Sequence, residues 1–131
     1  MRIDGRELAA IFVGGFAGAV TRAVLGEVLP HHAGQWPWAT FTVNVAGAFA
    51  LGYFATRLQE RLPLSAYRRP LLGTGVCGAL TTFSTMQLEL LDMLDRDRFG
   101  LALTYAGASV IAGFVAVAVA TNVVRRARIA A

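Results

Sequence analysis

The sequence is poor in charged residues and has almost no cysteine. Only 15% of its 131 residues are charged, eight residues are acidic, and there is no lysine. The single cysteine, Cys77, excludes an intrachain disulfide, and its apolar surroundings favour a packed side chain. Because 56% of the residues are hydrophobic, the composition is too apolar for a soluble domain of this length and indicates a membrane protein.

The basic residues are all arginine, and they give the chain a formal net charge of +4. A basic stripe along one face would indicate binding to nucleic acid. Most of these arginines instead lie between apolar runs, as is typical of the polar flanks of membrane spans.

Four apolar stretches are long enough to cross a bilayer, which takes roughly 20 mostly apolar residues per helix. They cover residues 7–29, 37–59, 69–94 and 100–124 and are joined by short polar connections. The sequence therefore predicts an all-α membrane protein with four transmembrane helices in one domain, residues 1–131. His31 and His32 in the first connection have no nearby ligand partners, so we assign them no role.

Small residues recur along every predicted helix, including a GxxxG pattern at Gly14 and Gly18. Such residues let helix backbones approach closely in lipid. Four short helices with this much small-residue surface enclose little volume by themselves. The pattern indicates an oligomer, and a dimer is the simplest one.

Asn44 lies near the middle of the second predicted span. An amide at that depth needs a protein partner or a wet path, because burying it unpaired is costly. The sequence leaves open both an interhelical hydrogen bond and a place on a transport path.

The third predicted span contains a polar segment near its middle. Gly78 is followed by the hydroxyl residues Thr81, Thr82, Ser84 and Thr85, a composition of poor helix propensity. One interpretation is a broken helix whose freed carbonyls suit a hard cation. The other is an intact helix whose hydroxyls bond back to preceding carbonyls.

The polar groups of these spans suit a small, strongly hydrated anion. The amide and the hydroxyls are neutral donors, and the edge of the Phe83 ring carries partial positive charge. Neutral donors replace hydration without holding an ion too firmly for conduction. Arg22, toward the end of the first span, either concentrates anions or extends to the interface as an anchor.

Three segments, residues 14–22, 40–47 and 75–85, resemble the CrcB/Fluc family of fluoride channels, and the last segment is the most specific. The resemblance covers nearly the full length. It implies a third helix broken near its middle, an antiparallel dual-topology dimer, two narrow fluoride pores and a structural sodium ion. The implied function is passive export that lowers cytoplasmic fluoride and gives fluoride resistance.

The resemblance also implies roles for individual residues. The backbone carbonyls of Gly78 and Thr81 match sodium ligands that both subunits contribute. Residues that match positions of the fluoride pore are Asn44, Phe83, Ser84, Thr85, Glu89, Tyr105 and, less closely, Ser109. The family's second phenylalanine is replaced by Met86, whose thioether has no ring edge to offer. We expect altered rate or selectivity, or a subunit that supplies only part of each pore.

Arginine is distributed unequally between the two predicted sides. The side of both termini and the middle connection carries nine arginines: Arg2, Arg6, Arg57, Arg61, Arg68, Arg69, Arg125, Arg126 and Arg128. The other side carries Arg22, Arg96 and Arg98. The positive-inside rule then predicts cytoplasmic termini in the plasma (inner) membrane and disfavours insertion both ways. We expect an antiparallel partner that is a homologous second subunit, with a homodimer as the alternative.

Other function classes fit the sequence less well. A small multidrug-type proton-coupled exporter needs a titratable group within its first helix, but Glu7 and Glu27 lie only at the ends. A purely structural subunit leaves the polar groups within the spans unexplained. Cys77 has no evident histidine or carboxylate partner, and no triad or metal constellation is evident, so the chain is not expected to be an enzyme.

Overall fold

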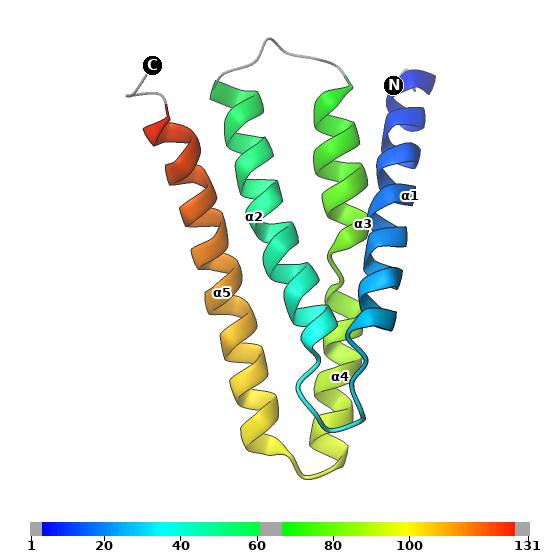
Figure 1. Cartoon of the computed structure of the whole chain (residues 1–131), viewed down its shortest axis with the longest axis vertical. Coiled ribbons are helices and arrows are strands. Elements are labelled where there is room, and N and C mark those ends of the chain that lie inside the picture. Colours follow the sequence, from blue (N-terminus) through cyan, green and yellow to red (C-terminus); the bar gives the residue numbers. More distant parts are fainter. Residues whose placement is uncertain (1–3, 61–66, 128–131) are drawn as a thin grey trace.

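The computed structural model of the chain describes residues 4–60 and 67–127. The described residues are almost entirely helical (Figure 1). The helices are α1 (Gly5–Val28), α2 (Trp38–Glu60), η1 (Pro70–Cys77), α3 (Gly78–Leu80), α4 (Phe83–Asp95) and α5 (Phe99–Arg126). The predicted all-helical architecture is therefore present.

Three of these helices correspond to three of the predicted spans. The bounds of α1, α2 and α5 lie within one or two residues of the predicted ranges 7–29, 37–59 and 100–124. By length and composition, α1, α5 and residues Trp38–Leu58 of α2 can each cross a membrane. Asp4 caps α1 by accepting a hydrogen bond from the Arg6 backbone N–H at 2.9 Å.

The remaining predicted span, residues 69–94, is divided. It begins as the π-helix η1, continues through one turn of α3, and resumes as α4. Thr81 and Thr82 between them are extended, with ψ angles of 151° and 108°. The break near the middle of this span is thus present, and the alternative of an intact helix is wrong.

The helices pack in pairs that are not consecutive in the sequence. α1 lies against η1 and α3, whereas α2 lies against α5 (Figure 1). A Cβ atom at Gly14 would collide with the carbonyl oxygen of Leu71, and one at Gly18 with that of Val76. The GxxxG pattern therefore serves close packing of α1 on η1 within one chain.

The ends of the helices confirm the predicted alternation of direction. α1 begins, α2 ends, η1 begins and α5 ends at the same end of the bundle (Figure 1). Arg2, Arg61 and Arg128, which enter the predicted arginine count on that side, lie outside the described residues.

A buried apolar cluster lies between α4 and α5. Met86, Met93, Ala102 and Tyr105 form a buried cluster, and the Trp36 ring packs edge-on against Tyr105 at a centroid distance of 5.3 Å. This cluster joins α4 and α5 to the Trp36 side chain of the first connection.

Candidate functional site

Asn44 clamps the break in the third span. Its Nδ2 donates to the Thr82 carbonyl at 3.1 Å, and its Oδ1 accepts from the Thr82 N–H at 2.8 Å. A side-chain amide thus pairs with both backbone groups of a residue outside any helix. These bonds replace the helical partners that Thr82 has lost, so the polar break is stable at this depth.

Thr82 also caps the start of α4. Its hydroxyl accepts from the Thr85 N–H at 3.2 Å and donates to the Thr85 hydroxyl at 2.8 Å. This arrangement is a helix N-cap, which satisfies one of the free N–H groups of the first turn. Together with the Asn44 bonds, it fixes the direction in which α4 leaves the break.

The break changes the partners of the two carbonyls matched to a sodium site. In a continuous helix, the Thr82 N–H would donate to the Gly78 carbonyl and the Thr85 N–H to the Thr81 carbonyl. These N–H groups donate to Asn44 and to the Thr82 hydroxyl instead. Both carbonyls therefore lose their usual helical donor, and such carbonyls suit a hard cation.

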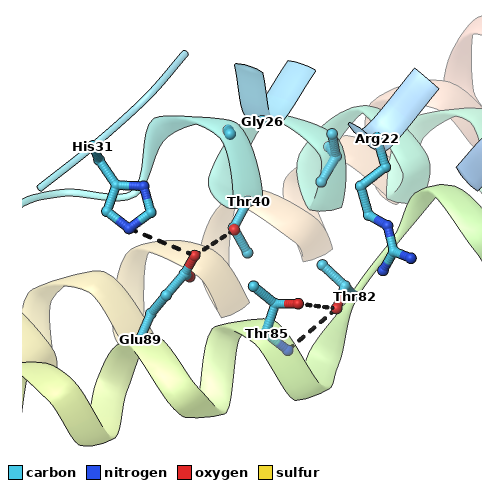
Figure 2. Close-up of a pocket in the computed structure, with 9 residues that line it drawn as sticks. Arg22, Gly26, His31, Thr40, Thr82, Thr85 and Glu89 are labelled. Atoms are coloured by element: carbon cyan, nitrogen blue, oxygen red, sulfur yellow. Dashed lines mark hydrogen bonds and ion pairs between the residues drawn. The ribbon is translucent and has the colours of Figure 1, made fainter. Parts of the chain in front are cut away.

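A pocket of about 260 Å³ lies beside the break (Figure 2). Its lining combines a cation, a carboxylate and several neutral hydroxyls. Its residues come from α1, the first connection, α2, the break and α4: Arg22, Gly26, His31, Ala39, Thr40, Val43, Thr82, Thr85 and Glu89. The pocket brings together Arg22, Thr85 and Glu89, which were all candidates from the sequence.

Glu89 is the centre of the polar contacts in this pocket. Its carboxylate accepts hydrogen bonds from the Thr40 hydroxyl at 2.5 Å and the Tyr105 hydroxyl at 2.7 Å. The Nε2 atom of His31 lies 3.9 Å from Oε1 of Glu89. Figure 2 shows His31 and Thr40 both directed at this carboxylate. The carboxylate is thus held from α2, α5 and the first connection.

Tyr105 and Met86 belong to the buried cluster behind Glu89, whereas Ser109 lies outside it. Tyr105 is fully buried, and Met86 is 9% exposed in the same cluster. Ser109 lies one turn beyond Tyr105 on α5, and its buried Oγ has no hydrogen-bond partner within the described residues. Tyr105 therefore contributes to the site by its hydrogen bond to Glu89, whereas Met86 packs among the side chains that position Tyr105.

Phe83 and Ser84 point away from this pocket. Phe83 is 71% exposed, and Ser84 beside it is also exposed. They stand at the first turn of α4, directly after the break. Within a single chain, these two candidates are therefore separated from Arg22, Thr85 and Glu89.

Two residues of the site were not assigned a role from the sequence, Thr40 and His31. Thr40 lies one helical turn before Asn44, so helical periodicity places both on one face of α2 and offers a signal for it. His31 was set aside for lack of a nearby partner. Its partner Glu89 is 58 positions away, and no local pattern reveals that proximity.

Comparison with known proteins gives consistent matches along the chain. Residues 9–121 match the family model described as CrcB-like protein, Camphor Resistance (CrcB). Fluoride-specific ion channel FluC 1 of Mycobacterium bovis is 59% identical over 126 residues, which cover 96% of each chain.

More distant relatives match over similar lengths. Fluoride-specific ion channel FluC of Caulobacter vibrioides is 38% identical over 92% of this chain and 96% of its own. FluC 2 of Nocardia farcinica is 37% identical over 94% of this chain and 88% of its own. The resemblance carried by residues 14–22, 40–47 and 75–85 is thereby confirmed, and the chain belongs to the CrcB/FluC family.

Proposed function

We propose that this chain is a subunit of a fluoride-selective channel that lowers cytoplasmic fluoride by passive export. The observation that carries the proposal is 59% identity, over 96% of both chains, to a protein named fluoride-specific ion channel. Channel relatives also support the expectation that the chain is not an enzyme.

The pocket beside the break supplies groups that suit the passage of an anion. Arg22 provides a fixed positive charge, and Thr82 and Thr85 provide neutral hydroxyls next to it. One N–H of the Asn44 amide is used by the Thr82 carbonyl, and the amide carries a second N–H that can face an ion. Neutral donors substitute for water around fluoride, while the arginine raises the local anion concentration.

We infer that the pore is completed by a second subunit. Phe83 and Ser84 are exposed in a single chain, although the third span places them near mid-membrane. A hydroxyl facing lipid at that depth is unfavourable, so this surface is better suited to protein. Gly107 and Gly113 of α5 have no atoms within 4 Å of where a Cβ would stand, which leaves close-packing surface for a partner. An antiparallel dimer accounts for both features.

A structural sodium ion fits the carbonyls at the break. We propose that the Gly78 and Thr81 carbonyls of both subunits bind it, since each has lost its helical donor. When bound, the ion supplies positive charge that holds these carbonyl dipoles together where the subunits meet.

Met86 takes little part in this proposed path. Its thioether packs in the buried cluster with Tyr105, so of positions 83 and 86 only Phe83 offers an aromatic edge. We therefore infer that ring-edge contacts to fluoride are fewer here than in family members that carry both phenylalanines.

The arginine bias favours a partner of opposite orientation that is a separate, homologous subunit. Within the described residues, Arg6, Arg57, Arg68, Arg69, Arg125 and Arg126 lie toward the proposed cytoplasmic end, whereas Arg22, Arg96 and Arg98 lie toward the other. Such asymmetry disfavours dual insertion of one chain in the plasma membrane. A homodimer is the alternative.

The proposal is tested by fluoride efflux from liposomes that contain this protein, alone and then with a candidate partner subunit. A fluoride electrode records the efflux, and chloride serves as the control anion. Fast fluoride-selective efflux from the chain alone supports a homodimer, and efflux that requires the partner supports a heterodimer. Absence of efflux in both arrangements contradicts the channel proposal. A pH electrode in the same assay detects the proton coupling expected of a multidrug-type exporter.

A further inference from the structure

His31 stands between two pockets. It lines the pocket of Figure 2 and also a second pocket of about 360 Å³. Thr85 and Glu89 line both pockets as well, so these three residues form their common boundary. An ion that passes from the break toward the first connection through these pockets must cross this boundary.

The first connection is anchored close to His31. The Gly34 N–H donates to Oδ2 of Asp92 at 2.9 Å, and Arg96 Nε bonds to Oδ1 of the same carboxylate at 3.0 Å. Gly34 has a φ angle of 74°, a conformation that favours glycine, and a Cβ there would crowd the Arg96 side chain. His31 therefore lies three residues before Gly34, which this hydrogen bond anchors to α4.

The contact between His31 and Glu89 is electrostatic. The separation of 3.9 Å is too long for a hydrogen bond, so the attraction depends on a protonated imidazole. The side chains are 31% and 10% exposed, respectively, so solvent only partly screens the pair. The two hydrogen bonds that Glu89 accepts from Thr40 and Tyr105 come from neutral groups.

Other charged or titratable groups also lie around this boundary. They are Arg22 of α1, Asp92 of α4, Arg96 directly after α4, Tyr105 of α5, and the adjacent His32, which lines neither pocket. Asp92 is paired with Arg96. Arg22 lines the same pocket but forms no ion pair with Glu89 within the described residues, whereas His31 lies 3.9 Å from its carboxylate. The charge state of His31 therefore decides whether Glu89 has a cationic partner at the boundary.

We propose that His31 is a rate-determining residue of the anion path. Protonated His31 compensates the charge of Glu89 and lets an anion cross between the pockets, whereas the neutral imidazole leaves an electrostatic barrier. This inference rests on the proposed function. It predicts a fluoride flux that rises as pH falls, through a residue outside the membrane-spanning helices.

The test measures fluoride efflux with equal pH on both sides, in whichever assembly conducts, at several values between about pH 5.5 and 8, the range in which histidine usually changes charge. Protein-free liposomes give the background leak of the neutral acid. We expect flux through the unaltered protein to rise several-fold toward low pH. His31→Gln should remove this rise, and His31→Arg should give high flux across the whole range.

His32→Gln is the matched control, because it removes the neighbouring imidazole and should leave the pH profile unchanged. The inference is overturned if His31→Gln keeps the rise of flux at low pH, or if His31→Arg resembles His31→Gln at high pH. An unaltered protein that conducts fluoride with a flat pH profile also overturns it while leaving the channel proposal intact. An unaltered protein without fluoride efflux removes both.

Discussion

Asn44 is the residue on which the shape of the broken span depends most directly. It uses one side chain to satisfy both the N–H and the carbonyl of Thr82, and Thr82 in turn caps α4. A hydrophobic substitution therefore leaves two backbone groups without partners in a part of the chain that water reaches poorly. The amide is a structural part of the break as well as a candidate contact for the ion.

We expect Asn44→Ala to lower the free energy of unfolding by about 2–4 kcal/mol, since each unpaired buried polar group costs about 1–3 kcal/mol. Thermal or denaturant unfolding of the purified protein in detergent measures the change. Asn122→Ala, at an exposed position of α5, is the control and should have little effect. Equal stability of the two variants would show that the Asn44 hydrogen bonds do not stabilise the break.

Thr40 tests whether the hydrogen bonds to Glu89 matter for conduction. Thr40→Val keeps the shape of the side chain but removes the 2.5 Å donor, so the carboxylate repels an anion more strongly. We expect fluoride efflux to fall on the order of tenfold, because a hydrogen bond to a charged group contributes about 1.5–3 kcal/mol. Efflux from liposomes measures it.

Thr104→Val provides the matched control for Thr40→Val. Its hydroxyl is exposed and donates to the Gly100 carbonyl of its own helix at 2.7 Å, so it has no contact with the pocket. Equal loss of flux in both variants would rule out a specific role for the Thr40 bond.

At the scale of the element, the break in the third span was partly predictable from the sequence. The clustered hydroxyls after Gly78 indicated weak helix propensity, and the family resemblance favoured a break over an intact helix. The partners that make the break stable come from Asn44, on a different helix. Such long-range pairing leaves no local pattern, which is also why His31 was missed while Arg22, Thr85 and Glu89 were found.

The contact between α1 and η1 depends on the absence of side chains. Gly14→Ala would bring a Cβ against the Leu71 carbonyl, and backbone cannot move aside as a flexible side chain can. We expect a loss of about 1–3 kcal/mol in unfolding free energy, as for other overpacked sites. Gly15→Ala, one position along and with nothing within 4 Å, should be neutral or stabilising. Unfolding in detergent compares them, and equal destabilisation would argue against this packing.

At the scale of the whole molecule, the distribution of arginine predicts a single orientation in the membrane. The native thiol is buried, so Cys77→Ala gives a background without accessible cysteine. A cysteine introduced next to Arg6 should then react with an impermeant thiol reagent only from the cytoplasmic side when the chain is expressed alone. Similar labelling from both sides would contradict the heterodimer proposal and favour a dual-topology homodimer.

The pairing of helices that are not consecutive also has a consequence for biosynthesis. α1 packs on η1 and α3, and α2 packs on α5, so the first two helices leave the ribosome before either has its main partner. The first pair cannot form until residues 70–80 have been made, and the second must wait for residues 99–126. The same delay applies to the bond between Gly34 and Asp92, so the first connection settles only after α4 has been synthesised. The pocket therefore cannot assemble until α4 has been made, late in the synthesis of the chain.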